Sequence, residues 1–268
     1  MSRSAMLIDT SKCMACRGCQ VACKQWNDLE GLSPSTSASR GSYENPGDRS
    51  PNTWTRIRFV EYEGGGRFQW LFLKEGCMHC QEAACVEVCS TGALKHAANG
   101  SVTFQEELCN GCGYCRTFCP FDTPRLQVTN TLSGAAKSSK CTFCQDRTSN
   151  GLLPACVKTC PSGALDWGDR DGILAKAQAR VEQLRSELGF TQANLYGANE
   201  LGGLGRLYVL TAPPEAYGLP ANPVYPTLAI AWQRVLQPLG HLAFGAAMLG
   251  IVGAFAVARR HIKMEEVQ

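Results

Sequence analysis

The alternation of apolar and polar residues predicts short strands joined by turns. Residues 5–8 and 206–211 are short apolar runs, which are typical of buried strands. Residues 53–62 and 67–73 are rich in β-branched and aromatic side chains and flank three consecutive glycines, 64–66. That arrangement predicts a β-hairpin.

Turn and loop signals separate these strands. Asn99-Gly100 predicts the turn of a second hairpin. Residues 31–52 form a long Gly-, Ser-, Asn- and Pro-rich stretch, which is predicted to be a loop. Residues 129–140 are interpreted as a polar link and 145–155 as a loop. Residues 212–226 contain five prolines and are predicted to be an extended connector without regular structure.

Helical periodicity predicts two helices of different kinds. Residues 21–26 predict only a helical turn, but 172–188 predict an amphipathic helix that ends at Gly189. Its apolar residues alternate at spacings of three and four: Leu174, Ala177, Val181, Leu184 and Leu188. Residues 239–258 carry no charge, and at 1.5 Å per residue they span about 30 Å, the thickness of a bilayer core. We therefore expect a single transmembrane helix there.

The charges beside this helix predict its orientation. Arg259, Arg260 and Lys263 follow it, whereas Arg234 alone lies just before it. The positive-inside rule then places the C-terminus in the cytoplasm and the rest of the chain on the periplasmic side of the inner membrane. A stripe of small residues along the helix predicts a transmembrane partner. The stripe consists of Ala246, Gly250, Ala254 and Ala258.

Composition adds little beyond one residue type. The chain has 268 residues and a formal net charge of +3, which does not favour nucleic acid as a partner. Residues 1–10 contain no apolar run suited to a signal peptide and no twin arginine. Sixteen cysteines stand out, and we expect them to be loaded in the reducing cytoplasm.

The cysteines form four quartets of similar spacing. Cys109-x-x-Cys112-x-x-Cys115-x-x-x-Cys119-Pro120 is the bacterial ferredoxin run, in which three cysteines hold one [4Fe-4S] cluster and the fourth reaches another. The other quartets keep this order with insertions in two of them: Cys13, Cys16, Cys19 and Cys23; Cys77, Cys80, Cys85 and Cys89; Cys141, Cys144, Cys156 and Cys160. All sixteen cysteines are thus predicted ligands of four [4Fe-4S] clusters.

Other uses of these cysteines fit the spacing poorly. A disulfide framework suits small secreted chains, and structural zinc sites pair two Cys-x-x-Cys units across a long spacer. His79 lies inside the second quartet, but four cysteines already complete that set. A purely structural metal module remains the alternative from a different functional class.

The quartets also indicate a duplication. Cys89-Ser-Thr-Gly-Ala-Leu94 matches Cys160-Pro-Ser-Gly-Ala-Leu165. We predict an α+β fold of two duplicated, ferredoxin-like two-cluster units with loop insertions, plus the C-terminal transmembrane helix. The predicted segments are a four-cluster domain at 1–169, a segment with the amphipathic helix, a strand and the connector at 170–236, and the membrane helix with its basic tail at 237–268.

The chain closely resembles the β (iron–sulfur) subunits of respiratory, membrane-bound formate dehydrogenases. The resemblance covers nearly the whole chain and includes Glu75-Gly-Cys-Met-His-Cys80, Asn110-Gly-Cys-Gly-Tyr-Cys115 and Pro154-Ala-Cys-Val-Lys-Thr-Cys-Pro161. The quartets alone mark a wider family of four-cluster subunits of molybdenum enzymes and some hydrogenases. Relatives of the nitrate reductase type replace one cysteine and hold a [3Fe-4S] cluster, whereas this sequence keeps every cysteine.

The resemblance implies partners and a role. The partners would be a catalytic α subunit with bis-molybdopterin guanine dinucleotide (molybdenum or tungsten) and one [4Fe-4S] cluster, and a membrane γ subunit, a b-type cytochrome that reduces quinone. The chain itself would be non-catalytic and would pass electrons from α to the haem. Export of the folded αβ pair on a twin-arginine signal of α would bring the cluster domain to the periplasm. The same electron-transfer subunit serving a hydrogenase or a dimethyl sulfoxide reductase is the alternative.

The resemblance also implies a nested ligand set. Cys13, Cys16 and Cys19 would share a cluster with Cys160, and Cys141, Cys144 and Cys156 would share one with Cys23. Cys77, Cys80 and Cys85 would take Cys119, and Cys109, Cys112 and Cys115 would take Cys89. The residues alone do not separate this arrangement from consecutive pairing of the quartets.

Overall fold

The computed structural model describes residues 3–31, 43–64, 66–231 and 235–261. The chain forms two compact units, Met1–Tyr225 and Pro226–Gln268, which are described separately. Part of the predicted loop 31–52 and the charges at Arg234 and Lys263 lie outside the described residues.

A four-stranded sheet organises the first unit. Its strand order is β8 (Leu165–Asp169), β1 (Ser4–Asp9), β10 (Arg206–Leu210) and β9 (Asn194–Tyr196). β1 pairs in parallel with β10 and antiparallel with β8, and β9 pairs antiparallel with β10. Residues about 200 positions apart in the chain therefore lie side by side in its centre.

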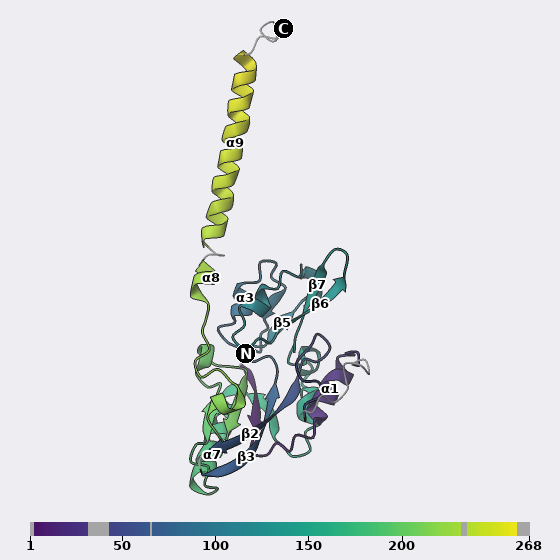
Figure 1. Cartoon of the computed structure of the whole chain (residues 1–268), viewed down its shortest axis with the longest axis vertical. Coiled ribbons are helices and arrows are strands. Elements are labelled where there is room, and N and C mark those ends of the chain that lie inside the picture. The colour runs from purple at the N-terminus through teal and green to yellow at the C-terminus, as the bar shows by residue number, and fades with distance from the viewer. Residues whose placement is uncertain (1–2, 32–42, 65, 232–234, 262–268) are drawn as a thin grey trace. The chain divides into compact units, whose positions relative to one another are not determined.

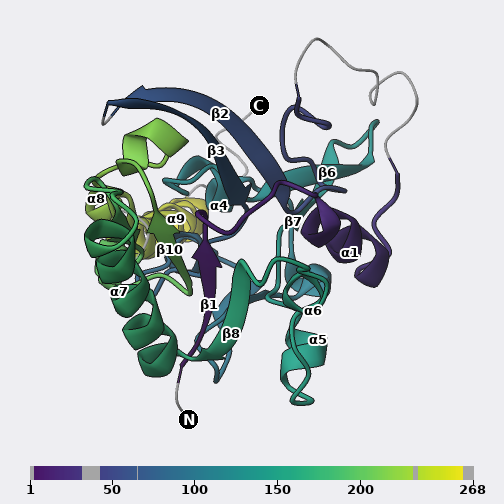
Figure 2. The ribbon, with the colours of Figure 1, turned by 90° about the horizontal axis from the view of Figure 1, so that it is seen from below.

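The two faces of this sheet have different coverings. Helix α7 (Arg170–Ser186) lies along one face, where its Ala177, Val181 and Leu184 pack with Val209 of β10. Successive strand side chains point to opposite faces, so Tyr208 belongs to a second core on the other face. Figure 2 shows α7 on one side of these strands, with α1, α5 and α6 on the other.

The cysteine-bearing segments consist of hairpins and short helices. The hairpins are β2 (Arg56–Gly64) with β3 (Arg67–Glu75), β4 (Leu94–His96) with β5 (Val102–Phe104), and β6 (Arg125–Asn130) with β7 (Ala135–Ser139). The α-helices are α1 (Gly18–Trp26), α3 (Ala84–Glu87), α4 (Tyr114–Thr117), α5 (Gln145–Thr148) and α6 (Ala155–Lys158). The 3-10 turns are η1 (Glu106–Leu108), η2 (Glu200–Gly202) and η3 (Pro214–Tyr217).

Most predicted elements are confirmed with small changes of boundary. The strands at 5–8 and 206–211 are β1 and β10, and the two predicted hairpins are β2–β3 and β4–β5. The amphipathic helix begins at Arg170 and ends at Ser186, so Leu188 lies beyond it and is exposed. Gly189 still reverses the chain with φ +68°, and the N–H of Phe190 then donates to the carbonyl of Leu184.

The prediction for residues 129–140 was wrong, and the loop predicted at 145–155 is confirmed only at 149–154. The first contains the end of β6 and all of β7, and Val128 on β6 is exposed, so no apolar alternation marks this ribbon. Its turn is held instead by Asn130, whose side-chain oxygen accepts from the N–H groups of Leu132 and Ser133. The second contains α5 and the start of α6.

The connector at 212–226 is also more regular than predicted. It includes η3, which begins with Pro214 after Pro213. The first residues of a helical turn need no N–H donor, so proline is compatible with these positions. The predicted domain boundary between residues 169 and 170 would place β1 and β10 in different segments, although the two strands pair in one sheet. The division of the chain into these segments stays a prediction.

The second unit contains α8 (Thr227–Ala231) and the long helix α9 (Gln237–His261), which forms the yellow end of the ribbon in Figure 1. Residues Gln237–Arg260 have a mean hydropathy of 1.9 over their most apolar stretch, and none of that stretch is buried. Among the described residues, this is the one helix long and apolar enough to cross a membrane. It contains the predicted span 239–258.

Candidate metal centres

Each quartet begins with a Cys-x-x-Cys turn of the same unusual backbone. The residue just before the second cysteine has a positive φ in all four: Ala15 (54°), His79 (51°), Gly111 (77°) and Phe143 (60°). Left-handed residues in such turns point successive N–H groups to one side. In the fourth quartet the N–H of Phe143 lies 3.4 Å from Sγ of Cys141. The turns are therefore shaped to surround an anionic group with N–H donors.

Gly111 is the one glycine among these four positions, and a neighbouring strand explains it. A Cβ placed on Gly111 would lie 2.3 Å from the carbonyl oxygen of Ala136 in β7. The hairpin β6–β7 thus presses directly on the third-quartet turn. No larger residue fits without moving that strand.

Three cavities collect cysteines from different quartets. The Cys13 cavity is lined by Cys13, Cys16, Cys19 and Cys160. The Cys23 cavity is lined by Cys23, Cys141, Cys144 and Cys156. The Cys89 cavity is lined by Cys89, Cys109, Cys112 and Cys115.

The remaining four cysteines influence one another directly; they are called the Cys77 group. Burial raises the pKa of Cys80, and the neighbouring thiols Cys77, Cys119 and Cys85 raise it further. Cys77 and Cys119 act in the same way on Cys85, as does Cys115 of the Cys89 cavity. Each of the four groups thus combines three cysteines from one quartet with one from another. Which cysteines share a cluster stays a prediction.

The geometry of the thiols fits a cluster better than a single ion. All sixteen cysteines lie in the described part of the chain, and all are free of disulfides. A lone zinc ion needs its sulfurs within about 2.3 Å of one point. Among the described residues, no three His, Cys, Asp or Glu side chains converge in that way. Four thiols that line one cavity without converging on a single point suit a polynuclear iron–sulfur group.

Burial favours the protonated form at several of these thiols. Burial raises the pKa of Cys19 to about 11 and that of Cys144 to about 12. Cys141 is an exception: burial would raise its pKa, but the guanidinium of Arg206 and the ammonium of Lys74 outweigh burial and lower it. Positive charge therefore outweighs burial at Cys141, but not at Cys19, where Lys74 also acts on the thiol.

The second and fourth cysteine quartets end in segments that match each other in sequence and structure. Residues 83–94 and 154–165 run through α3 and α6, each starting at Ala-Cys-Val, and then to the first residue of β4 and β8. In both, a hydroxyl two residues after the last cysteine lies 3.7 Å from its sulfur, Thr91 at Cys89 and Ser162 at Cys160. Gly92 and Gly163 then turn the chain with φ of 67° and 62°.

His79 has a structural role in this arrangement. It is buried, its ring stacks on Phe143 at 3.8 Å between centroids, and its Nδ1 accepts from the N–H of Val102 at 3.0 Å. Burial and the nearby cations Lys140 and Arg206 lower its pKa well below the ordinary value. A neutral ring packed in this way supports the expectation that the cysteines alone serve as ligands.

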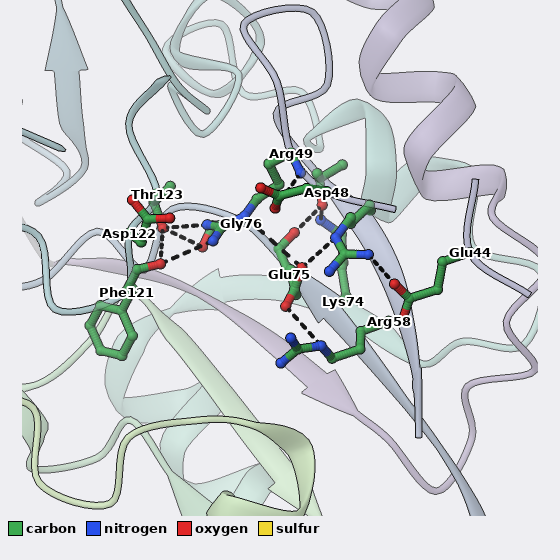
Figure 3. A network of polar contacts seen from close by, with 12 residues as sticks. Glu44, Asp48, Arg49, Arg58, Lys74, Glu75, Gly76, Phe121, Asp122 and Thr123 are labelled. Atoms are coloured by element: carbon green, nitrogen blue, oxygen red, sulfur yellow. Dashed lines mark hydrogen bonds and ion pairs between the residues drawn. The ribbon is translucent and has the colours of Figure 1, made fainter. Parts of the chain in front are cut away.

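A network of ion pairs fastens the β2–β3 hairpin to the Cys77 group (Figure 3). The carboxylate of Glu75, two residues before Cys77, meets Arg56 at 2.6 Å, Arg58 at 3.4 Å and Arg49 at 4.0 Å. Arg49 also donates to Thr123 and to the carbonyl of Phe121, just beyond Cys119. The guanidinium groups in this network are thus balanced by carboxylates.

Sequence reasoning missed two residues at the Cys23 cavity, Lys74 and Arg206. Lys74 follows the buried Leu71 and Leu73 on β3, and Arg206 begins β10, in which every residue is buried. A lone charged residue at the edge of an apolar strand was the available signal.

Comparison with known proteins agrees with this geometry. Residues 12–93 and 68–170 each match the 4Fe-4S dicluster domain, and together they include all sixteen cysteines. The chain is 42% identical to the iron–sulfur subunit of the nitrate-inducible formate dehydrogenase of Escherichia coli, over 92% of this chain and 83% of that one. It is 40% identical to the formate dehydrogenase iron–sulfur subunit of Haemophilus influenzae, over 98% and 83%. It is 34% identical to formate dehydrogenase 2 subunit beta of Nitratidesulfovibrio vulgaris, over 80% and 95%.

Proposed function

Because the chain belongs to the iron–sulfur subunits of formate dehydrogenases, we propose that it links a formate-oxidising subunit to an electron acceptor in the membrane. The electron-transfer role itself follows from the homology and from the two 4Fe-4S dicluster matches. Four [4Fe-4S] clusters fit the sixteen cysteines. Bound in the protein, such clusters take up and release single electrons.

The assignment of ligands is part of this proposal. The Cys13, Cys23 and Cys89 cavities and the Cys77 group would hold one cluster each, with the nested sets given above. The grouping of thiols from separate quartets around single cavities is the observation that carries the proposal. The protein's contribution is to supply the thiolates, surround them with N–H groups and keep water out.

Exposure indicates where electrons would enter and leave. Most of the cysteines are shielded, but Cys16 of the Cys13 cavity and Cys112 of the Cys89 cavity are exposed. These two occupy the same place in their quartets, the second cysteine of the ferredoxin run. We propose that the side of Cys16 faces the catalytic subunit and the side of Cys112 faces the membrane partner.

The partners and the membrane arrangement are proposals as well. They are a catalytic subunit with bis-molybdopterin guanine dinucleotide and one [4Fe-4S] cluster, and a b-type cytochrome that reduces quinone. Helix α9 is consistent with a single-pass anchor. Its stripe of Ala246, Gly250, Ala254 and Ala258 would meet a transmembrane helix of the cytochrome. The cluster-bearing unit would lie in the periplasm, which protease accessibility in intact spheroplasts tests.

We also propose that the cluster-binding part arose by duplication. The matching segments 83–94 and 154–165 support it, since they share sequence, helix position and the sulfur–hydroxyl contact. The second 4Fe-4S match begins at residue 68, inside the first, so the boundary between the two halves is not a simple cut in the chain.

Substitution of one ligand tests the function. Cys115→Ser should remove or convert one cluster and abolish electron flow from formate to quinone, while formate oxidation with an artificial dye at the catalytic subunit persists. Quinone reduction at an unchanged rate would contradict a linear path. Iron and sulfide analysis of the unsubstituted chain should give about sixteen irons, at four per cluster.

A further inference from the structure

Two cations are fully buried at the Cys23 cavity. Lys74 is 2% exposed, lines both the Cys23 and the Cys13 cavities, and donates from Nζ to the hydroxyl of Thr55 at 2.7 Å. Arg206 is 0% exposed and lines the Cys23 cavity, with Nη2 3.7 Å from Sγ of Cys141. Positive charge therefore reaches this cavity from strands β3 and β10.

Neither cation has a carboxylate partner among the described residues, where every ion pair found involves other side chains. Nε and Nη1 of Arg206 also lack hydrogen-bond partners within that part of the chain. The arginines beside Cys77 differ, since Glu75 and Glu44 balance Arg56 there.

A buried cation without a counter-charge is costly, and proteins pair such charges or bind ions with them. Four thiols line the same cavity as Lys74 and Arg206: Cys23, Cys141, Cys144 and Cys156. The other polar groups close to the two cations are the neutral hydroxyls of Thr55, at Lys74, and Tyr208, at Arg206. Four thiolates around an iron–sulfur cluster carry net negative charge, which would balance both cations. Among the described residues, no lysine, arginine or histidine lines the Cys89 cavity, and the nearby Lys137 donates to the backbone carbonyl of Cys109.

We propose that Lys74 and Arg206 are fixed counter-charges to a cluster in the Cys23 cavity and raise its reduction potential above that of the cluster in the Cys89 cavity. This inference rests on the proposed ligand sets. Reduction adds one electron, and so one negative charge, which a nearby fixed positive charge stabilises. At the effective dielectric of a protein, two unit charges within about 10 Å of each other interact strongly enough to change the equilibrium constant of reduction more than tenfold.

The test is a redox titration followed by EPR on the full-length chain, purified anaerobically from membranes with the subunits that accompany it. Lys74→Met and Arg206→Gln each remove one charge at similar side-chain size. Arg206→Gln should lower the midpoint potential of one cluster signal by about 59 mV or more, a tenfold change for one electron. Lys74→Met should lower the same signal and also that of the Cys13 cavity, which Lys74 lines as well. The signal that both variants shift must be the one that Cys144→Ser removes or alters, and the signal that Cys115→Ser alters should move less.

Charge-conserving variants separate charge from structure. Lys74→Arg and Arg206→Lys keep the positive charge and should leave that potential near its original value. Lys176→Met removes an exposed ammonium on α7 and should leave every signal in place. If the Arg206→Gln variant binds less iron than the unsubstituted chain, iron content becomes a second readout. The Arg206→Lys variant should then have the iron content of the unsubstituted chain.

The outcomes distinguish the inference from the function on which it rests. Fewer than about sixteen irons in the unsubstituted chain would contradict the proposed clusters. Full iron content with unchanged potentials in both Lys74→Met and Arg206→Gln would overturn the counter-charge proposal and leave the function standing. If Lys74→Met and Arg206→Gln lose iron, an equal loss of iron in the charge-conserving variants would also overturn the counter-charge proposal. Iron retained in the charge-conserving variants would support the proposal.

Discussion

The Cys23 cavity and the Cys89 cavity share the same kind of Cys-x-x-Cys turn but are lined by different side chains. Phe143 and Gly111 occupy the same left-handed position in their Cys-x-x-Cys turns. Around the Cys23 cavity lie Lys74 and Arg206, whereas the Cys89 cavity is lined by apolar side chains such as Leu94 and Leu126. Ligand spacing thus gives the two sites a common shape, and distant strands give them different charge.

This difference has a physical consequence for electron transfer. Cluster type and thiolate ligation are the same in both proposed sites, so charge, burial and hydrogen bonds are what remain to separate their potentials. The carboxylate-balanced arginines around Glu75 contribute mainly to the fold. Lys74 and Arg206 have no carboxylate partner and lie beside cysteine thiols, so their charge would act on the cluster proposed for the Cys23 cavity.

Ligand substitutions in the two cavities give the largest expected effect. Cys144→Ser and Cys115→Ser should each lower the iron content from about sixteen to about twelve per chain where the cluster is lost. Cys144→Ser should cost about 3 kcal/mol more in the free energy of unfolding, because Lys74 and Arg206 then lose their counter-charge. Iron analysis and denaturant unfolding measure both. Equal destabilisation would remove the contrast between the cavities.

Removal of the shared carboxylate beside the Cys77 group comes next. Glu75→Gln leaves Arg49, Arg56 and Arg58 without their common partner, and the side chains of Arg49 and Arg56 are at most 10% exposed. We expect a loss of about 3 kcal/mol in the free energy of unfolding, with the iron content retained. Denaturant unfolding tests this. The exposed pair Lys176–Asp166 offers the control, since Asp166→Asn should change stability by less than about 1 kcal/mol.

A third substitution tests the backbone of the Cys89 cavity. Gly111→Ala adds a Cβ 2.3 Å from the carbonyl of Ala136 at a φ of 77°, so we expect a loss of about 3 kcal/mol from clash and strain together. Gly134→Ala is the matched control: its φ is 68°, but its added Cβ meets nothing within 4 Å. It should cost about 1 kcal/mol from strain alone. Similar losses in the two variants would show that β7 yields to the added atom.

The smallest expected effect lies at the edge of the ion-pair network. Burial alone would raise the pKa of Asp48, but the N–H of Arg49 and the guanidinium of Arg125 lower it. The stabilisation is therefore present above the ordinary aspartate pKa of about 4 and is lost only as pH falls through the lower folded-state value. Asp48→Asn should destabilise the protein by less than about 1 kcal/mol, because the side chain is 66% exposed. The loss should be equal at pH 5 and pH 8, because the carboxylate is ionised at both values. A difference that changes between those pH values would contradict the lowered pKa.

The ribbon β6–β7 and helix α5 show where sequence patterns fail. Periodicity predicts elements that bury one face, such as α7, whose Ala177, Val181 and Leu184 are buried as expected. β6–β7 has an exposed Val128 and small polar neighbours, so its pairing depends on the Asn130 turn and on backbone hydrogen bonds. Short helices such as α5 are set by the cysteine turns that precede them rather than by an apolar stripe.

The sequence by itself determined the number of cysteines, their four-quartet order and the apolar C-terminal helix, because local spacing and hydropathy carry that information. Only the tertiary structure decided which thiols share a cavity and which cations lie beside them. Arg206 reaches Cys141 because β10 pairs with β1, about 200 residues earlier in the chain, and turns alternate side chains toward the cavities. Contacts of that range depend on the pairing of whole strands, which no local pattern of residues records.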